Sequence, residues 1–323
     1  MSEFERHKLK PLKLQSNGTV SLKPRLSVIC ITYNHGKYLR ECLEGILAQE
    51  TAFNVEIIVH DDASTDNSQE IIREYEKNYP EVFKTILQRT NQLGVIGGRI
   101  VLNAFSKASG DFIAYCDGDD RWTDPLKLQH QVDFLDANQE CSGCFHATRL
   151  IDNAGEVLRQ DYFLPSLEKH DTSECISLLA SAYSTSSLVF RREALESPPE
   201  WLCKNLTDLF LEFQISRFGK VAFINRNMSD YRRHGGGIWS GRSMTNRLVE
   251  LIHRYKTLLE EPEFAEKHAE VIKARIDEYS AMLICKNESG LAMEQRAKAA
   301  DYEIISRSKW VRLGQALGIC HQP

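Results

Sequence analysis

The sequence predicts an α/β protein whose mostly parallel sheet carries helices on both faces. Two continuous apolar runs, at 26–32 and 55–59, are typical of strands that are buried on both faces. Apolar residues at helical spacing follow each run. Strands that alternate with helices in this way form mostly parallel sheets.

Residues 1–24 are expected to form a loose tail, and residues 25–140 the first half of a globular domain. The pair Asp124-Pro125 is expected to open a helix, with Asp as the N-cap and Pro at the first helical position. In chain order we expect a strand at 26–32, a helix through 39–47, a strand at 55–59, a helix around 71–75, a strand at 83–87, a Gly-rich loop at 94–98, a helix through 100–108, a strand at 111–116 and a helix after 124.

The second half of this domain is expected at 141–242, followed by a helical region at 243–323. Between 243 and 308 the chain is charged and nearly free of Gly and Pro, which favours helices. Within the second half we expect a strand at 143–148, a hairpin turn at 151–157, a strand at 187–190, a helix at 206–218, and a strand at 221–224 before a Gly-rich loop at 235–237.

The composition disfavours several classes of protein. A formal net charge of −5 argues against a nucleic-acid partner, because such proteins normally carry a basic excess. No apolar run approaches the roughly 20 residues that cross a bilayer. Nine scattered cysteines and a polar N-terminus without the apolar core of a secretory signal predict a reducing, cytoplasmic location. Cys141 and Cys144, with His146 nearby, lack the second pair that a zinc site needs, so core packing is the favoured interpretation.

Acidic residues cluster at 60–66 and at 117–120, each directly after a predicted strand. The carboxyl ends of parallel strands line the ligand crevice of such sheets, so we expect both clusters to share one crevice. Three carboxylates within 117–120 repel one another unless a cation relieves them. A calcium EF-hand loop is excluded, because its fifth and twelfth positions would be Arg121 and Leu128. A divalent metal that holds a diphosphate is the favoured ligand.

Three segments, at 26–34, 60–66 and 110–120, resemble in order and spacing the successive motifs of family 2 glycosyltransferases. One departure is Ala63, where the family usually has Gly; it should matter only if that position needs a positive φ angle. The resemblance implies a GT-A fold with a Rossmann-like sheet. It also implies an inverting transfer from a nucleoside-diphosphate sugar, expected to be UDP-linked, with Mn²⁺ or Mg²⁺ as cofactor.

The resemblance assigns roles to individual residues on the donor side. Asp119 is expected to ligate the metal as part of the DxD motif. Asp117 is expected near the ribose or the metal, and His234 at the metal or the diphosphate; the role of Asp120 stays open. The expected donor-binding residues are Thr32, Tyr33, Asn34, Asp61, Asp62, Arg99, Asp117, Gly118 and Arg232.

The general base of the reaction is expected at Asp208, which resembles the family's Asp at a helix start in the second half. Thr207 or Asp208 could instead simply cap that helix. Asp161 and Asp171 compete for the role of base and are less favoured. The Ser- and Thr-rich stretch at 184–191 resembles a segment that lines the acceptor side.

Other functions and partners stay open at this point. A sugar nucleotidyltransferase is the nearest alternative, although the turn after the first strand lacks the Gly run that holds a triphosphate. A non-catalytic nucleotide-sugar binding protein is the second alternative.

The enzyme is expected to transfer a hexose or an N-acetylhexosamine to a growing glycan or a lipid-linked saccharide. The helices at 243–308 could form a homodimer. A peripheral contact of 306–313 with the inner face of the cell membrane is less favoured than a packed terminal helix.

Overall fold

The computed structural model describes residues 23–92, 99–161, 168–178, 183–237 and 242–288. The expected glycine loop at 94–98 and the membrane-contact stretch at 306–313 lie outside these ranges, as does part of the expected helical region. By its contacts the chain divides into two compact units, Met1–Arg233 and His234–Pro323. This division falls earlier than the boundary after 242 that the sequence suggested.

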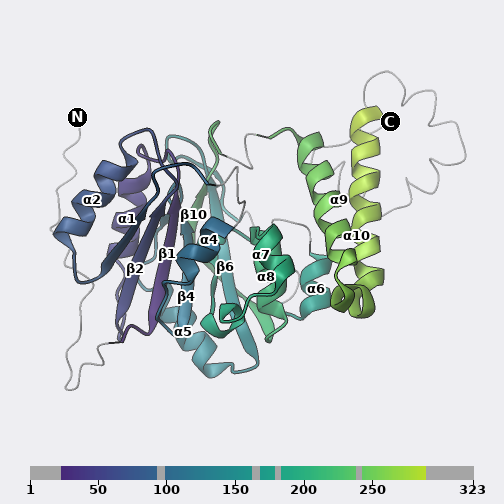
Figure 1. The fold of residues 1–323 in the computed structure, drawn as a ribbon, viewed down its shortest axis with the longest axis horizontal. Helices are drawn as coiled ribbons and strands as arrows, with labels where there is room; N and C mark the ends of the chain where they lie inside the picture. Colours follow the sequence, from purple (N-terminus) through teal and green to yellow (C-terminus); the bar gives the residue numbers. More distant parts are fainter. Residues whose placement is uncertain (1–22, 93–98, 162–167, 179–182, 238–241, 289–323) are drawn as a thin grey trace, which may run out of the picture. The chain divides into compact units, whose positions relative to one another are not determined.

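The first unit is built on a sheet with ten strands in its described part (Figure 1). Its N-terminal half is entirely parallel, with strand order β3-β2-β1-β4. The elements of this half are β1 (Leu26–Thr32), α1 (Leu39–Leu47), β2 (Val55–Asp61), α2 (Ser68–Asn78), β3 (Phe83–Leu87), α4 (Arg99–Phe105) and β4 (Phe112–Asp117). The predicted alternation of strands and helices is therefore confirmed here.

Beyond β4 the sheet becomes mixed, because β9 joins it antiparallel to both β4 and β6. Strand β10 runs parallel to β6 and antiparallel to β5. Because β5 directly follows residues 117–120 in the chain, this pairing fixes the end of the acidic cluster to the sheet. The predicted hairpin turn after β6 is present, since the Asp152 amide donates to the Glu156 carbonyl at 2.9 Å. The strands of this half are β5 (Arg121–Trp122), β6 (Cys141–Ile151), β7 (Val157–Arg159), β8 (Lys169–His170), β9 (Val189–Arg191) and β10 (Lys220–Arg232).

The helices of this half are α5 (Lys127–Ala137), α6 (Thr172–Ser177), α7 (Glu200–Asn205) and α8 (Asp208–Ser216). The prediction that Asp124-Pro125 opens a helix is wrong by a few residues. Asp124 instead closes a turn ahead of α5: its carboxylate accepts the Leu126 amide at 2.9 Å, and its carbonyl accepts the Lys127 amide at 3.2 Å. Helix α5 then begins at Lys127.

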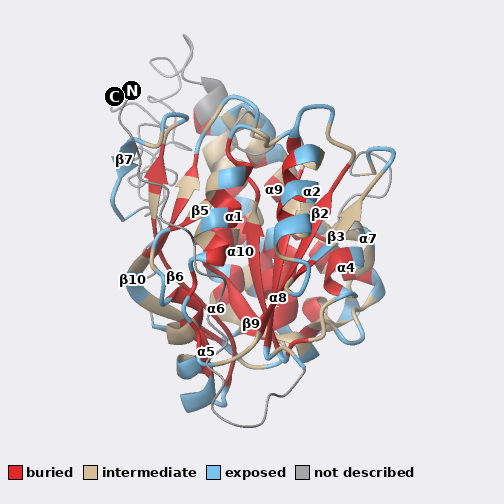
Figure 2. Ribbon diagram, turned by 90° about the vertical axis from the view of Figure 1, so that its left-hand side faces the viewer, coloured by how far each residue is buried: buried red, intermediate tan, exposed pale blue. Residues whose placement is uncertain are grey.

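Helices cover both faces of the sheet, and its strands are buried along most of their length (Figure 2). Alternate residues of β1 and β4 pack with α1, α2 and α5 in one apolar cluster. On the opposite face the Phe105 ring of α4 meets Tyr115 at 5.8 Å between centroids. Cys141, Cys144 and His146 are buried in β6, as the core-packing interpretation predicted.

The second unit contains a hairpin of two long helices, α9 (Met244–Glu260) and α10 (Pro262–Glu288). The Ser243 hydroxyl caps α9 by accepting the Asn246 amide at 3.2 Å. The rings of Tyr255 and Tyr279 pack between the helices with centroids 5.7 Å apart. Among the described helices, none is both long and apolar enough to span a membrane.

Candidate active site

The two acidic motifs meet at one edge of the sheet. Strand β1 lies between β2 and β4, and all three run parallel. In register, Thr32 pairs with Asp61 and Ile31 pairs with Asp117, so both motifs leave the sheet at the same end. The two motifs therefore lie at one edge of the sheet although they are far apart in sequence, and a common crevice between them stays a prediction.

Asn34 fixes the turn after β1 to the loop after β2. Its backbone adopts a left-handed conformation with φ of 57°, which Asn tolerates better than most residues. Its amide donates to the Ser64 hydroxyl at 2.8 Å, and its side-chain oxygen accepts the Thr65 amide at 2.7 Å. Asn34 therefore positions this loop, in addition to the donor contact expected of it.

Asp61 and Asp62 are both buried, and protein groups occupy oxygens of each. Asp61 accepts the Ser64 amide at 3.0 Å and the Gln69 side chain at 2.6 Å. Asp62 accepts the Gln92 amide at 2.7 Å. Direct base recognition by either carboxylate stays a prediction.

Ala63 has a φ of 60°, so this position does require the left-handed region. For a residue with a Cβ this conformation costs roughly 1–2 kcal/mol relative to the right-handed one. The departure from the family's usual Gly therefore carries a strain, which the contacts of Asn34 and Asp61 with this loop offset.

The loop after β4 packs tightly against the end of β1. A Cβ at Gly118 would lie 2.8 Å from the Thr32 hydroxyl oxygen and 3.1 Å from His35 Nδ1. Only glycine therefore permits this approach. The Thr32 side chain is buried beneath Gly118, whereas Tyr33 is partly exposed. Their expected contacts with a nucleotide stay predictions, and the side chain of Arg99 lies outside the described residues.

Asp117 is partly buried at the end of β4, and protein donors face both its oxygens. Tyr115 donates to Oδ1 at 3.2 Å, and Thr185 donates to Oδ2 at 2.6 Å. Burial first, and the neighbouring Asp119 second, raise the pKa of Asp117 to about 7. The Ser- and Thr-rich stretch thus touches the acidic cluster itself, through Thr185.

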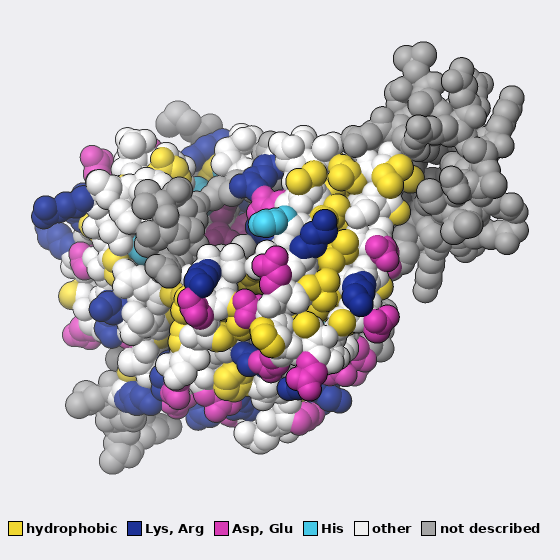
Figure 3. All heavy atoms as spheres, turned by 45° about the vertical axis from the view of Figure 1, so that its right-hand side comes forward, with side chains coloured by type: hydrophobic (Ala, Val, Ile, Leu, Met, Phe, Trp, Pro, Cys, Tyr) yellow, Lys and Arg dark blue, Asp and Glu magenta, His cyan; other side chains and the backbone are white. Residues whose placement is uncertain are grey.

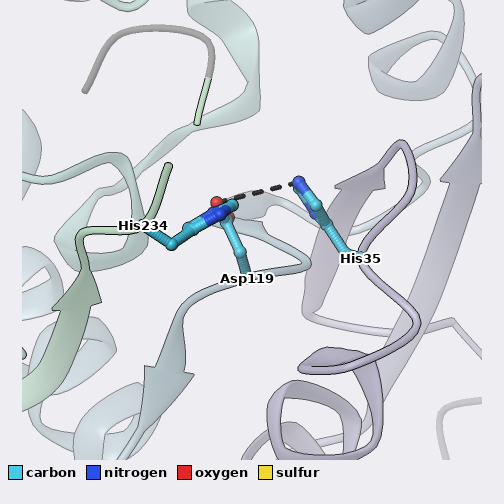
Figure 4. Close-up of side chains that lie close together, drawn as sticks. All are labelled: His35, Asp119 and His234. Atoms are coloured by element: carbon cyan, nitrogen blue, oxygen red, sulfur yellow. Dashed lines mark ion pairs between the residues drawn. The ribbon is translucent and has the colours of Figure 1, made fainter. Parts of the chain in front are cut away.

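Asp119 lies beside the imidazoles of His35 and His234. Among the described residues, these three side chains form the group that fits a divalent metal. Asp119 Oδ2 is 3.7 Å from His35 Nε2. His234 directly follows Arg233, whose amide donates to the Ile151 carbonyl at 2.9 Å. One ligand atom from each of Asp119, His35 and His234 lies within 4.8 Å of the others (Figure 4). One carboxylate and two neutral imidazoles are competent ligands for a divalent ion, so these residues fit the expected metal. Asp117 is not part of this group.

Asp120 and Arg232 anchor the acidic loop to β10. Asp120 is buried, and its Oδ1 accepts the Arg232 amide at 2.8 Å. The Arg232 side chain donates to the Asp119 carbonyl at 2.9 Å and to the Asp152 carbonyl at 3.3 Å, and it pairs with Glu41. Its guanidinium therefore faces protein groups. These contacts favour a positioning role for Arg232 over the expected phosphate contact.

Alternating charges extend from Arg232 across the end of the sheet. Glu41 pairs with both Arg232 and Arg121. Arg121 also donates to the fully buried Asp230 at 2.7 Å, and Arg149 donates to the same carboxylate at 2.6 Å. This charge chain, Arg149–Asp230–Arg121–Glu41–Arg232, ends on the backbone of the acidic loop. Figure 3 shows acidic, basic and histidine side chains gathered near the middle of one face.

Asp208 is the first residue of α8, and the cap of this helix is supplied by its neighbour. The Thr207 hydroxyl accepts the Phe210 amide at 3.3 Å, whereas the exposed Asp208 carboxylate accepts the adjacent Leu209 amide at 3.0 Å. Burial is the main cause that raises the pKa values of Tyr115 and Asp117, and the charge of Asp208 adds to both shifts, which places this carboxylate near the acidic loop.

The two rival bases are occupied elsewhere. Asp171 forms a capping box with Glu174 at the start of α6, in which each side chain accepts the other residue's amide. Asp161 accepts a hydrogen bond from Asn227 at 3.0 Å. Neither arrangement connects these carboxylates to Asp119. The geometry therefore favours Asp208.

Glu212 lies one turn after Asp208 on α8 and is almost fully buried. Burial, followed by the charge of Asp208, raises the pKa of Glu212 to about 8, against the opposing effect of Tyr183. The folded state thus keeps a proton on this carboxyl at pH values where the unfolded chain, near the usual value of 4.5, has lost it.

We expect Glu212→Gln to remove this pH dependence of stability. Between pH 4.5 and about 8 the free energy of unfolding of the natural chain should fall relative to the variant, by at most about 1.4 kcal/mol per pH unit. Below pH 4.5 and above about pH 8, the difference in the free energy of unfolding between the natural chain and the variant should be constant. Urea unfolding of both chains at a series of pH values measures it, and parallel curves through the window would contradict the assignment.

Three contacts were not anticipated from the sequence. His35, Thr185 and Glu41 all reach the acidic loop or its anchor, yet none belongs to the acidic motifs. The Ser- and Thr-rich stretch gave a weak signal for Thr185. A histidine three residues after the end of an apolar run gave no signal for His35, because its partner lies over eighty positions away in sequence.

Proteins of similar sequence and structure have related descriptions. An uncharacterized protein of Mycobacterium tuberculosis is 38% identical over 66% of this chain and 60% of its own length. Glycosyltransferase GlyG of Streptococcus pneumoniae is 31% identical over 66% of this chain and 72% of its own length. This chain thus spans about 60% of the length of the mycobacterial relative.

Two solved structures share the fold at low sequence identity. The TarS 1-349 structure from S. aureus in complex with UDP-GlcNAc has a TM-score of 0.56 and 19% identity, covering 91% of this chain and 81% of that chain. The mannosyltransferase PcManGT from Pyrobaculum calidifontis, in complex with GDP-Man and Mn²⁺, has a TM-score of 0.55 and 17% identity, covering 92% and 85%. Both likenesses support the GT-A fold.

The model of one protein family matches residues 27–197, a stretch that begins in β1 and ends after β9. It includes both acidic motifs and the Ser- and Thr-rich stretch that contacts the second of them. The match covers more than half of the chain. The chain therefore belongs to glycosyl transferase family 2.

Proposed function

We propose that this protein is an inverting glycosyltransferase that moves a sugar from a nucleoside-diphosphate donor to a hydroxyl acceptor. The observation that carries the proposal is the convergence of Asp119 and the exposed Asp208 near the same sheet edge in a family 2 chain. An acid cluster can hold a metal–diphosphate, and an exposed carboxylate can accept a proton.

In the proposed reaction the acceptor oxygen attacks the anomeric carbon as the bond from that carbon to the diphosphate oxygen breaks. Asp208 takes the proton of the acceptor hydroxyl, and the nucleoside diphosphate leaves with the bonding electrons. Attack opposite to the leaving group inverts the anomeric configuration. Asp119 and His234 would hold a divalent metal, which would supply positive charge to stabilise the departing diphosphate.

The remaining residues orient this chemistry. Asp120 and Arg232 hold the backbone of the acidic loop. Thr185 and Tyr115 direct the Asp117 carboxylate, which we place on the ribose side of the donor. Such fixed groups lower the barrier because they need no rearrangement as charge develops.

For the donor we propose a UDP-linked hexose or N-acetylhexosamine, supported by the UDP-GlcNAc complex of TarS. The GDP-Man complex of PcManGT makes a GDP-linked sugar the alternative. For the acceptor we propose a growing glycan or a lipid-linked saccharide, in line with one relative, from Bacillus subtilis, that is described as a putative teichuronic acid biosynthesis glycosyltransferase. A cytoplasmic location agrees with the eight described cysteines, which are all free thiols.

A thermal-shift screen of UDP- and GDP-sugars, with Mn²⁺ and with a chelator, tests this proposal. A specific donor at a hundred times its Kd stabilises the fold by about 2.7 kcal/mol, and we expect this gain only with the metal. Stabilisation by nucleoside triphosphates, with pyrophosphate released from a sugar 1-phosphate, would instead identify a nucleotidyltransferase.

A further inference from the structure

We infer that His35 is a direct ligand of the divalent cation and that its imidazole biases the site toward transition-metal ions over Mg²⁺. The inference rests on the proposed function and adds to it a ligand from the turn between β1 and α1. It also assigns a metal preference that neither acidic motif carries.

The distance between the two side chains suits a shared ion. His35 Nε2 and Asp119 Oδ2 are 3.7 Å apart. Two donors that each lie about 2.1 Å from one ion can be at most about 4.2 Å apart, so this pair can bind together without moving the backbone. Each side chain is about one-sixth exposed, at 17% and 16%, so an ion can reach them from solvent.

The local backbone holds His35 in this position. Its carbonyl accepts the amides of Tyr38 and Leu39, both at 2.8 Å, at the start of α1. The next amide, of Gly36, donates to Asp66 at 2.9 Å. The turn is thus tied to both α1 and the loop after β2 before any ligand binds, which lowers the entropy cost of binding.

The orientation of the ring also matters. Nδ1 lies against Gly118, where even a methyl group would approach it to 3.1 Å. Nε2 is the nitrogen nearest to the Asp119 carboxylate. Gly118 therefore has a role beyond its own loop, because its missing side chain lets the imidazole lie next to the metal ligand.

The donor set determines the expected preference. Mg²⁺ favours oxygen ligands and retains several waters, whereas first-row transition ions accept imidazole nitrogen readily. A site with Asp119 and His35 should therefore bind Mn²⁺, and Co²⁺ more tightly still, in preference to Mg²⁺. Exchanging the imidazole for an oxygen donor should reduce that preference.

Metal binding alone tests the inference, without substrate. The signal of free Mn²⁺ in electron paramagnetic resonance gives its Kd for the full chain, for His35→Ala, and for His35→Asp, and competition with Mg²⁺ gives the preference. We expect His35→Ala to weaken Mn²⁺ binding by about tenfold or more. His35→Asp should restore part of the affinity while lowering the ratio of Mn²⁺ to Mg²⁺ affinity. His130→Ala, at a partly buried histidine that contacts Arg226, is the matched control and should change neither value.

The outcomes separate this inference from the proposed function. If His35→Ala binds Mn²⁺ within about twofold of the natural chain while Asp119→Ala does not bind, His35 is not a ligand and the metal site stands. If Asp119→Ala also retains Mn²⁺, the proposed metal site itself is wrong. Thermal unfolding in chelator checks that each variant is folded. Should His35→Ala fail that check, His35→Gln replaces it, and an unchanged Mn²⁺ affinity in His35→Gln overturns the inference equally.

Discussion

Asp208→Asn is expected to lower kcat by about 10²–10⁴-fold while the affinity for the donor stays nearly unchanged. The amide keeps the size of the carboxylate but cannot accept the proton of the acceptor hydroxyl. The helix should remain intact, because Thr207 rather than Asp208 supplies its cap. Initial rates with a donor found by thermal shift, together with calorimetric donor binding, measure both quantities.

Asp171→Asn provides the control for this experiment. It replaces another aspartate at a helix start, and Asn can cap α6 nearly as well. Turnover in this variant should match the natural chain. Equal losses of kcat in both variants would show that the effect of Asp208→Asn arises from folding. Normal turnover in Asp208→Asn would remove Asp208 from the mechanism, and Asp161 would then be tested in the same way.

Asp119→Ala is expected to abolish metal-dependent donor binding. The substitution removes the one carboxylate that groups with His35 and His234 among the residues that the structure describes. Without a metal, the two phosphates of the donor would face the remaining acids of the loop with no cation to neutralise them. Titration calorimetry of the donor with and without Mn²⁺ should therefore show a metal effect only in the natural chain.

Asp111→Ala is the matched control, because Asp111 is exposed at the opposite end of β4, where it pairs with the exposed Lys23. Donor affinity in this variant should keep its full dependence on Mn²⁺. Should Asp119→Ala also keep it, the metal would have to be held by other groups, and the assignment of the DxD motif would be wrong.

The sequence allows the first half of the fold to be predicted well, because its strands are buried on both faces. Most residues of β1 and β2 are apolar, and the apolar residues of the helix between them, α1, recur at helical spacing. The meeting of the two acidic motifs follows directly from this pattern. The antiparallel insertion of β9 does not, since a strand of three residues carries too little pattern to reveal its partners.

The detail of the candidate site could be predicted only where one side chain carries the chemistry by itself. Asp119 and Asp208 are recognisable from their local motifs. The surroundings of Arg232 are not, because its partners Glu41 and Asp152 come from segments far away in the chain. The positive φ of Ala63 is likewise set by tertiary contacts and not by the alanine itself.

The charge chain from Arg149 to Arg232 has a consequence for how variation at these positions is tolerated. Every internal member balances two neighbours of opposite sign, so losing Glu41 alone leaves two guanidinium groups facing each other. A second substitution that removes one of these guanidinium groups would relieve the repulsion that the loss of Glu41 created. Whether a substitution in the charge chain is tolerated therefore depends on the residue at the neighbouring position. Descendants of this sequence would reach new combinations most easily by replacing two neighbouring members together. A survey of single substitutions alone would miss these combinations.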